Sequence, residues 1–409
     1  MVGAGCGLQV LQAGLLHHAF GGYLAVLQDD RGWNKTQLSG AAALQQMESA
    51  IIGPALGWIM DRFGPQGLIR LGVVMFGLGF IALSFVDTLL EFYAAFIVIA
   101  LGSSMCGFFP INVALINWFE RWRARALSAL SLGLAVGGIS VPIVGWSLVH
   151  FGWRATAFGS GVFAIAVGLP LAMVMRRRPE DHGETVDGVS QSSDSQKVSE
   201  DANSSVRDFT AREALRTPAF WLLSLGHGFA LLVVGAVNVH AIAHMKESLA
   251  YTVSAAALVI TLVTLFQIGG VLLGWVIGDR FEKRLIAAAC MLMHCLGLLS
   301  LTYAGAAASS TPWIIAFAAL HGVAWGLRGP FMHAIRADYF GRSAIGMILG
   351  LSFMIIVIGQ VGGPMIAGMA ADITGNYRSG FTVLALLAGV GSMFFVLAKR
   401  PAPPLRSPA

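Results

Sequence analysis

The stretch GWIMDRFG, residues 57–64, ends one apolar run and returns in altered form in the second half of the chain. Its Asp61-Arg62-Phe63 sequence recurs as Asp279-Arg280-Phe281, again after an apolar run. Further matches keep the same order, and all offsets lie between 218 and 224 residues: Trp118-Phe119 with Arg121 matches Tyr339-Phe340 with Arg342, Pro142 matches Pro364, and Trp153-Arg154 matches Tyr377-Arg378. Ordered matches at nearly one spacing indicate that the second half is a diverged copy of the first.

The composition is that of a membrane protein. Of the 409 residues, 56% are hydrophobic and only 11% are charged, whereas a soluble domain has about 25% charged residues. The charges gather in short clusters between apolar runs of about 20 residues, the length that a helix needs to cross a bilayer. We therefore expect an all-α membrane protein surrounded by a lipid bilayer.

The apolar runs predict twelve membrane spans, six on either side of a long polar segment. They lie near residues 6–28, 38–60, 67–87, 92–118, 126–149, 155–175, 219–243, 253–277, 285–305, 313–335, 343–369 and 379–398. The polar segment includes the serine-rich SQSSDSQ and has too little apolar material to form a core. The predicted domains are an N-terminal six-helix bundle, a cytoplasmic linker, a C-terminal six-helix bundle and a cytoplasmic tail, at 1–175, 176–217, 218–398 and 399–409.

The distribution of Lys and Arg predicts the orientation of the spans. With the N-terminus in the cytoplasm, the outward loops hold five basic residues, Arg328 lies inside a span, and the inward segments hold the other 20 of the 26. This bias predicts that both termini are cytoplasmic. Because most basic residues border spans, the net charge of +5 gives no reason to expect a nucleic-acid partner. The opening apolar run has no basic flank before it, so we expect no cleavable signal peptide.

Several other stretches, together with GWIMDRFG, carry a resemblance to a known family. They are DDRGWNKTQLSGA, NWFERWRARALS, FTAREALRTPAFWLL, and RADYFGRSAIGMILG with GPMIAGMAADITGNYR. Over its whole length the chain resembles the major facilitator superfamily, and within it the monocarboxylate transporter and oxalate/formate antiporter branch. The resemblance implies twelve helices in two six-helix halves around a central cavity, in a monomeric bacterial inner-membrane protein. It also implies a secondary carrier of a small organic anion, a monocarboxylate, that works by alternating access with proton symport.

The sequence departs from the family pattern at several positions. Pro65-Gln66 stands where the superfamily has two basic residues, and Glu282 replaces the glycine in the second copy. The N-terminus lacks the polar lead-in of family members, which indicates a late start of the chain. Monocarboxylate transporters carry an arginine in the eighth span, but residues 261–278 contain no basic residue and Gly270 lies at the aligned position. The anion-binding arginine of that family therefore cannot be assigned to this span.

Arg328 lies inside the predicted tenth span, in HGVAWGLRGPFMHAI (321–335). An arginine at the centre of a membrane helix costs about 2.5 to 3.5 kcal/mol on insertion scales, so it faces a cavity, a partner or a ligand. One helical face carries four large side chains: His321, Trp325, Arg328 and Met332. The resemblance places the tenth span beside the central cavity. Two interpretations stay open: Arg328 is a structural cation, or it replaces the missing arginine as the counter-charge for a carboxylate.

Glu48 is the only acid well inside a predicted span, where it shares a face with Gln45 and Ser49. Desolvation favours the protonated form of a buried carboxyl group, which is the property that a proton-coupled carrier needs. Glu48 is therefore the candidate for proton coupling. The alternative is that it pairs with a cation such as Arg328 or hydrogen-bonds within the bundle.

Histidine and asparagine residues inside the spans are further candidates for substrate contact. His227 and Asn238 share a face of the seventh span, and Asn112 lies on a polar face of the fourth. In the superfamily both spans border the cavity, so these residues are candidates to line it, together with the stripe of the tenth span. By contrast, His294 in the ninth span is expected to be peripheral.

Asp61-Arg62 and Asp279-Arg280 are the candidate gating residues. They lie where spans meet the cytoplasm, and in the superfamily these loops help to lock one conformation through charge and helix-end contacts. A carboxylate is stabilised at a helix N-terminus, and a partner that changes with conformation makes it a switch. The alternative for the two arginines is that they only set orientation.

The sequence contains no pattern for catalysis or for a cofactor. No Walker loop and no glycine fingerprint after a strand is present, and the scattered cysteines and histidines have no metal-ligand spacing. We therefore expect a protein that is not an enzyme and has no metal or cofactor. Two alternatives to an anion carrier stay open. One is a carrier or efflux pump for a cationic or neutral compound, with Glu48 at the ligand, and the other is a non-transporting sensor with the same fold.

Overall fold

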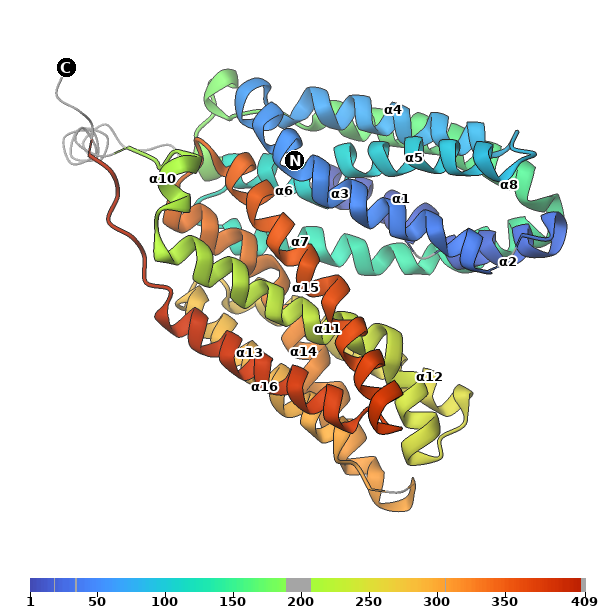
Figure 1. Ribbon diagram of the computed structural model, residues 1–409. Helices are drawn as coiled ribbons and strands as arrows, with labels where there is room; N and C mark the ends of the chain where they lie inside the picture. Colours follow the sequence, from blue (N-terminus) through green and yellow to red (C-terminus); the bar gives the residue numbers. More distant parts are fainter. Residues whose placement is uncertain (18, 34, 189–206, 306, 406–409) are drawn as a thin grey trace. The chain divides into compact units, whose positions relative to one another are not determined.

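The computed structural model describes residues 1–17, 19–33, 35–188, 207–305 and 307–405. Every secondary-structure element in these ranges is a helix (Figure 1), which confirms the predicted all-α architecture. Residues 189–206 of the predicted linker and 406–409 of the predicted tail lie outside this part of the chain. The chain divides into two compact units: Met1–Ser199 with Ile345–Gly350, and Glu200–Ala344 with Leu351–Ala409.

The first unit contains the helices of the first six predicted spans. They are α1 (Val2–Gln12), the π-helix η1 (Ala13–His17), α2 (Phe20–Arg31), α3 (Lys35–Phe63), α4 (Pro65–Leu83), α5 (Leu89–Cys106), α6 (Phe108–Trp118), α7 (Arg123–Val136), the 3-10 helix η2 (Gly137–Ser140) and α8 (Val141–Val174). Two 3-10 turns follow, η3 (Glu180–His182) and η4 (Val186–Gly188). Because α4 packs against α5 and α8, and α1 against α7 and α8, the core of the unit forms between these helices.

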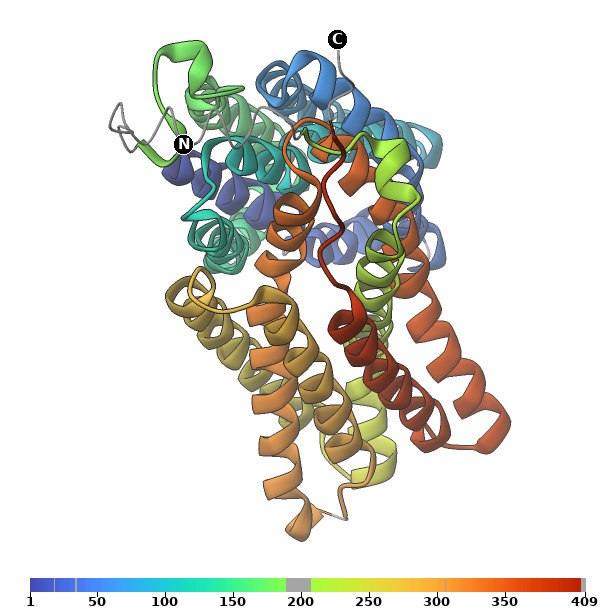
Figure 2. The same ribbon diagram turned by 90° about the vertical axis from the view of Figure 1, so that its left-hand side faces the viewer.

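The second unit contains the helices of the last six predicted spans. They are α11 (Pro218–Leu249), α12 (Val253–Ile277), α13 (Lys283–Thr302), α14 (Ala307–Phe340), α15 (Ile345–Thr374) and α16 (Arg378–Leu397), preceded by the short α10 (Ala211–Leu215). The first residues of α15, Ile345–Gly350, group with the first unit. Within the second unit, α14 packs against α12 and α13, and α16 packs against α11 and α13. Figure 2 shows α13 and α14 running side by side.

Several breaks interrupt the helices of the first unit. The first span passes from α1 into the π-helix η1, and the extended backbone of Gly107 separates α5 from α6 within the fourth span. Gly152 has a φ of 75° and breaks α8 between the predicted fifth and sixth spans. Side-chain hydropathy does not reveal the first two breaks because the residues around them are as apolar as the rest of the run.

Nine helices within the described ranges are long and apolar enough to cross a membrane. The other three predicted spans do not lie in a helix that is both long enough and apolar enough. Span 6–28 is divided among α1, η1 and α2; span 38–60 lies in α3, which carries Glu48 and several other polar residues; and span 126–149 is divided among α7, η2 and the start of α8. The six-plus-six order of the predicted spans is kept in the order of these helices.

Glycines bring α12 and α14 into backbone contact. A Cβ atom added at Gly326 of α14 would lie 1.9 Å from the carbonyl oxygen of Gln267, and one at Gly322 would lie 2.4 Å from that of Val263. Only a residue without a Cβ fits at such positions. The close approach of the two helices positions Arg328, which follows Gly326 by two residues.

The two ends of the linker bind matching loops of the two copies. The carboxylate of Asp187 accepts hydrogen bonds from three consecutive backbone N–H groups, and that of Arg121 donates at 2.8 Å. In the second unit, Asp208 accepts from the N–H groups of Arg342 at 2.9 Å and Ser343 at 3.0 Å. Arg121 and Arg342 are matched residues of the sequence repeat. The duplication is therefore present in local backbone structure as well as in sequence.

Candidate functional site

Arg328 is enclosed within the second unit. Its side chain is 1% exposed, and its Nε and Nη1 atoms are buried without a hydrogen-bond partner. Among the described residues, no carboxylate forms an ion pair with it. Pro330 follows within the same helix and cannot donate a backbone hydrogen bond. A buried guanidinium with unused donors is costly, so this geometry is suited to an anion that would accept from those nitrogens.

Arg336 is a second buried arginine of α14, which the sequence had placed at the border of the span. Its side chain is 1% exposed. Its Nη1 donates to the carbonyl oxygen of Met332 at 2.5 Å, and its Nη2 donates to that of Leu223 at 3.1 Å. Arg336 thus differs from Arg328 in having carbonyl acceptors that hold it. Its position inside the unit could not be read from hydropathy, since a border arginine and a buried one look the same in sequence.

His321 and Trp325 lie on the same face of α14 as Arg328, as predicted from their spacing. The His321 side chain is 0% exposed, whereas Trp325 is half-buried, and their ring centroids lie 6.1 Å apart. Met332, the last member of the stripe, is fully buried. The stripe therefore faces the interior of the second unit, with Trp325 its most accessible member.

His294 was expected to be peripheral, and this expectation is wrong. Its side chain on α13 is 0% exposed, and its Nδ1 lies 3.1 Å from Nδ1 of His321. The Nε2 atoms of both rings are buried without a hydrogen-bond partner. Helix rotation decides which face of α13 meets α14, and a single histidine in an apolar run does not reveal that rotation. The sequence signal was only that both helices carry a histidine.

His227 of α11 also belongs to this region, whereas Asn238 does not. The charges of Arg328 and Arg336 act on the half-buried imidazole of His227, whose Nδ1 atom is buried without a partner. Asn238 lies three turns further along the same helix, and its side chain is exposed. The second unit thus gathers three of the predicted contact residues around Arg328: His227, His321 and Trp325.

Gly270 is the position that the sequence resemblance aligned with an arginine. A Cβ atom added at Gly270 would lie 2.4 Å from the carbonyl oxygen of Val323 on α14. No side chain fits there without separating α12 from α14. The packing therefore excludes an arginine at this position, and the buried cations of this unit come from α14.

Glu48 and Asn112, the remaining predicted interior residues, belong to the first unit. The Glu48 carboxylate is half-buried and accepts hydrogen bonds from Ser104 at 2.8 Å and Ser49 at 3.1 Å, while its Oε1 is buried without a partner. Asn112 is fully buried and donates to the carbonyl oxygen of Phe108 at 2.6 Å. Glu48 is therefore held by hydroxyl groups, which agrees with its interpretation as a carboxyl hydrogen-bonded within a bundle.

Asp61 binds the N-terminus of α15. Its two carboxylate oxygens accept the backbone N–H groups of Gly346 and Met347, each at 2.8 Å. The residue before the helix is Ala344, whose side chain cannot accept a hydrogen bond, so Asp61 supplies the acceptor that an N-cap residue normally provides. All of these residues except Ala344 belong to the first unit.

The structure also explains the two glycines of GWIMDRFG, Gly57 and Gly64. A Cβ atom at Gly57 would lie 2.3 Å from the carbonyl oxygen of Gly346, and Gly64 has a φ of 84°. The first glycine permits the approach of α15 and the second permits a turn that other residues avoid. Glu282 replaces this glycine in the second copy, where its φ is −66° and needs no glycine.

The arginines of the gating pairs are exposed. The Arg62 guanidinium lies 5.6 Å from the ring centroids of Trp58 and of Phe63. Asp279 and Arg280 follow the end of α12, where Asp279 is half-buried and Arg280 exposed. The first copy thus makes a helix-end contact through Asp61, and both arginines lie at the surface.

An exposed charge cluster lies at the other end of the first unit. Asp87 accepts hydrogen bonds from Arg31 and Arg154, each at 2.6 Å. The hydrogen bond from Arg31 is the main reason why the pKa of this carboxyl group is lowered. Trp153 donates its indole N–H to Asp30 at 2.9 Å. The DDRGW stretch and the repeated pair Trp153-Arg154 therefore have a structural role, because these contacts join two loops to each other.

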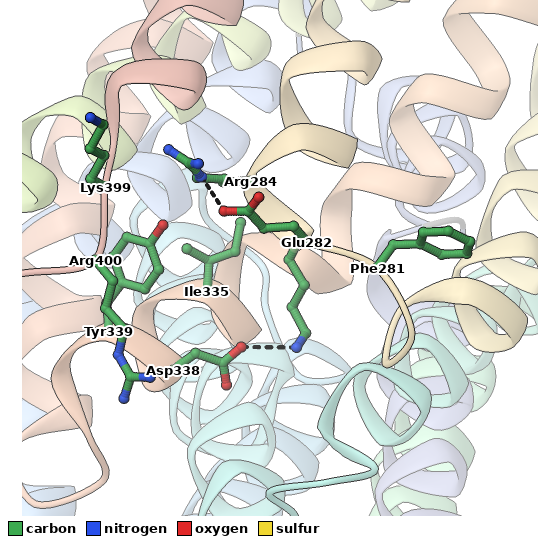
Figure 3. Close-up of a pocket in the computed structure, with 9 residues that line it drawn as sticks. Phe281, Glu282, Arg284, Ile335, Asp338, Tyr339, Lys399 and Arg400 are labelled. Carbon is green, nitrogen blue, oxygen red and sulfur yellow. Dashed lines mark hydrogen bonds and ion pairs between the residues drawn. The ribbon is translucent and has the colours of Figure 1, made fainter.

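A cavity of about 310 Å³ lies near the start of α13 and the ends of α14 and α16 (Figure 3). Its lining is strongly charged: Phe281, Glu282, Lys283, Arg284, Ile335, Asp338, Tyr339, Lys399 and Arg400. Lys283 pairs with Asp338 at 2.9 Å, and Arg284 pairs with Glu282. None of the predicted contact residues lines this cavity, so the cavity is not part of the region around Arg328.

Comparison with known proteins agrees with these features. The model of the Major Facilitator Superfamily matches residues 8–242 and 223–409. Monocarboxylate transporter 13 of Bos taurus is 26% identical over 359 residues, which cover 85% of this chain and 76% of the relative. The membrane sensor protein UhpC of Escherichia coli (strain K12) is 25% identical over 361 residues, which cover 83% and 78%.

A solved structure extends the comparison to the fold. The Escherichia coli fucose:proton symporter has a TM-score of 0.73 at 16% sequence identity and covers 98% of both chains. Together with the all-helical units and the duplicated loops, these matches identify the architecture that the sequence predicted. The chain belongs to the Major Facilitator Superfamily and has the fold of its multi-pass membrane transporters.

Proposed function

We propose that the protein is a secondary carrier of a small organic anion, a monocarboxylate, that works by alternating access. One observation carries the proposal: Arg328 is buried in the second unit with two guanidinium nitrogens that have no hydrogen-bond partner. Opposite charges attract far more strongly in such surroundings than in water. A carboxylate would satisfy the guanidinium fork through two hydrogen bonds, and its charge would offset the cost of burying the cation.

The neighbouring residues support an organic anion as the substrate. His321 and His227 offer nitrogen atoms to a carboxylate, and the half-buried ring of Trp325 offers an apolar surface to its carbon skeleton. We assign these three as contact residues with Arg328. Asn112 of the first unit and the exposed Asn238 stay predictions, as polar residues of the fourth and seventh spans, and are not part of this group around Arg328. The bovine relative is named as a monocarboxylate transporter, which fits this substrate class.

Glu48 is the proposed proton-coupling residue of the first unit. Ser49 and Ser104 bind one oxygen of its carboxylate, and the other oxygen is buried without a partner. Protonation of that oxygen would remove a buried negative charge and leave the hydroxyl contacts in place. A group of this kind can bind and release a proton during a transport cycle.

Asp61 is the proposed gate of the carrier. Its contact with the N-terminus of α15 joins the end of α3 to a helix from the second half of the sequence. Breaking and remaking such a contact during alternating access is the proposed role of Asp61-Arg62, and Asp279-Arg280 form the matching pair in the second copy. We propose a monomer in the inner membrane with both termini in the cytoplasm.

A second candidate is a carrier for a cationic or neutral compound. The observation that favours it is the unpartnered carboxylate oxygen of Glu48, which could accept a hydrogen bond from an ammonium group or a hydroxyl group. In that case Arg328 is a structural cation. The sign of the substrate charge separates the two candidates.

Thermal unfolding of the purified protein tests the proposal. Wild type, Arg328→Gln and Arg216→Gln would be heated with acetate, lactate, pyruvate or benzoate, and with choline or tetraethylammonium. Arg216 is exposed, so its variant controls for the loss of one positive charge. A ligand at 100 times its Kd stabilises the native state by about 2.7 kcal/mol. We expect a carboxylate to stabilise wild type and Arg216→Gln but not Arg328→Gln.

Two other results would contradict the proposal. Equal stabilisation of Arg328→Gln by carboxylates would make this arginine structural. Stabilisation of wild type by choline or tetraethylammonium, with no response to the four carboxylates, would favour the second candidate. Loss of that response in Glu48→Gln would then identify the cation contact.

A further inference from the structure

The buried pair of His294 and His321 lies beside the proposed anion site. Both side chains are 0% exposed, and their Nδ1 atoms are 3.1 Å apart. The charge of Arg328 acts on both imidazoles. The pair is thus close enough to the arginine for a charge on one to affect the other.

The short contact between the two Nδ1 atoms determines where the protons are. A hydrogen bond between two ring nitrogens needs one donor and one acceptor, so one ring has Nδ1–H and the other has a bare Nδ1. A neutral imidazole carries one N–H. The donor ring therefore has a bare Nε2, and the acceptor ring has Nε2–H. Among the described residues, neither Nε2 atom has a hydrogen-bond partner.

We propose that the His294–His321 pair is the proton-binding site that is linked to anion binding at Arg328. The inference rests on the proposed function and extends it. A proton binds to the lone pair of the bare Nε2 and no other bond breaks. The pair then carries one positive charge, shared across the Nδ1–H···Nδ1 hydrogen bond. Release of the proton is the reverse step.

Electrostatics links this proton to the anion. Without an anion, a protonated pair would place a second cation next to Arg328 in surroundings with no described counter-ion, which is unfavourable. A carboxylate on Arg328 cancels that repulsion and attracts the proton. Linkage is reciprocal, so protonation of the pair strengthens carboxylate binding by the same factor. The bound state then carries one anion and one proton together.

Other titratable groups near the pair are less suited to this role. The charge of Arg328 also acts on the Cys290 thiol of α13, on His227 of α11 and on His333 of α14 itself. The residues of α12, Val253–Ile277, include no titratable side chain, and the only one in α16 is Arg378 at its first residue. Because the charges of both Arg328 and Arg336 act on His227 and on His333, a proton on either would meet more repulsion than one on the pair.

Calorimetry tests the inference on the purified full chain. Whichever of acetate, lactate, pyruvate and benzoate binds wild type most tightly would be titrated at pH 7.5, in two buffers with different ionisation enthalpies. Carboxylic acids have pKa values of about 4, so the ligand itself is ionised and any proton uptake belongs to the protein. We expect uptake of about one proton per carboxylate, and an affinity that weakens by about tenfold per pH unit where only the bound state holds the proton.

Three variants locate the proton. His294→Asn and His321→Asn should each bind the carboxylate without taking up a proton. His244→Asn is the matched control, because His244 is buried on α11 but bonds to the carbonyl oxygen of Leu301, and it should keep the uptake. Glu48→Gln distinguishes the pair from the proton site proposed at Glu48 in the first unit. Uptake that disappears in Glu48→Gln and persists in both pair variants would overturn the inference.

The outcomes separate this inference from the proposed function. Failure of all four carboxylates to bind wild type would reject the anion site itself. Binding without proton uptake by wild type would reject only the role of the pair. If the pair variants fail to fold, ¹⁵N NMR of wild-type histidines decides independently. We expect one Nδ1–H and one Nε2–H tautomer in the ligand-free protein, and both rings protonated at Nε2 once the carboxylate is bound. Two Nε2–H tautomers without ligand would overturn the inference.

Discussion

Both units bury arginine side chains, but the two units differ in how those arginines are held. In the first unit, the buried polar side chains include Gln12, which donates to Ser103, and Arg123, whose Nε donates to the carbonyl oxygen of Phe119. In the second unit, the largest fully buried polar side chains are the arginines Arg328 and Arg336. Loop contacts were kept after duplication, since both copies present matching N–H groups to a carboxylate. Arg328 differs from both Arg123 and Arg336, because its Nε and Nη1 are buried without a hydrogen-bond partner, and this difference motivates the proposal that an anion binds in the second unit.

The largest expected effect concerns the helix contact that frames the cationic interior. Gly326→Ala would place a Cβ atom 1.9 Å from the backbone oxygen of Gln267. Since this atom belongs to a helix backbone, α12 and α14 must separate, and overpacking of this severity costs about 3 kcal/mol. Thermal unfolding should show a large loss of stability.

Gly329→Ala is the control on the same helix, because a Cβ there meets nothing within 4 Å. Gly102→Ala in the first unit would place a Cβ 2.3 Å from the backbone nitrogen of Phe76 and should cost less than Gly326→Ala. If all three variants unfold at the same temperature as wild type, the close backbone contact between α12 and α14 does not stabilise the folded protein.

The two buried arginines should respond differently to the same substitution. Arg336→Gln removes the charged donors that bind the carbonyl oxygens of Met332 and Leu223, and hydrogen bonds to charged groups contribute about 1.5–3 kcal/mol. Arg328→Gln removes a buried cation whose Nε and Nη1 make no hydrogen bond. Its stability in the absence of ligand should therefore equal or exceed that of wild type.

Thermal unfolding without added ligand checks this difference. A carboxylate should still stabilise Arg336→Gln, relative to the same variant without ligand. If Arg328→Gln is the less stable of the two, then Arg328 has a structural role. The two buried arginines would then not differ in the way that their hydrogen bonds predict.

Asp61 tests how far the first unit depends on a helix cap that is supplied by a residue distant in sequence. Asp61→Asn keeps the shape of the side chain but replaces one of the two oxygens that accept from Gly346 and Met347. Loss of a helix cap costs about 1 kcal/mol, and the cost falls on the state in which the contact is made. Labelling of a cysteine placed near α15 should become faster in this variant.

Arg62→Gln is the neighbouring control, since Arg62 is exposed and contacts only ring faces among the interactions described. Its labelling rate should stay within a factor of two of wild type, an energy difference of about 0.4 kcal/mol. An equal increase in both variants would mean that loss of charge, and not of the cap, causes the change.

The smallest expected effects come from the two linker contacts. Asp187→Ala and Asp208→Ala each remove a carboxylate from matching backbone N–H groups. Both carboxylates are near the surface, where water replaces the lost acceptor, so each variant should lose about 0.5–1 kcal/mol. Chemical unfolding measures both. A loss of stability in only one variant would show that only one of the two matching loops is stabilised by its carboxylate.

Much of this architecture could be predicted before the structure was available. The apolar runs predicted the helices of both halves, and the Asp-Arg-Phe and Trp-Arg repeats predicted the duplication, because hydropathy and repeats are properties of sequence order. Boundaries were less accurate where the backbone departs from a helix. Gly107 interrupts the fourth span, and glycine in an apolar run is also common in continuous helices.

The site was predictable only in part. Arg328 was identified because a cation in an apolar run is unfavourable wherever that run folds, and its stripe followed from helical periodicity. The contact of His294 with His321, the burial of Arg336 and the capping of α15 by Asp61 were not predictable. Each depends on how one helix is rotated and which helix it meets, and residues distant in sequence decide that through packing. Sequence order alone thus determined the membrane helices and the anomalous charge, while tertiary packing decided which groups surround that charge.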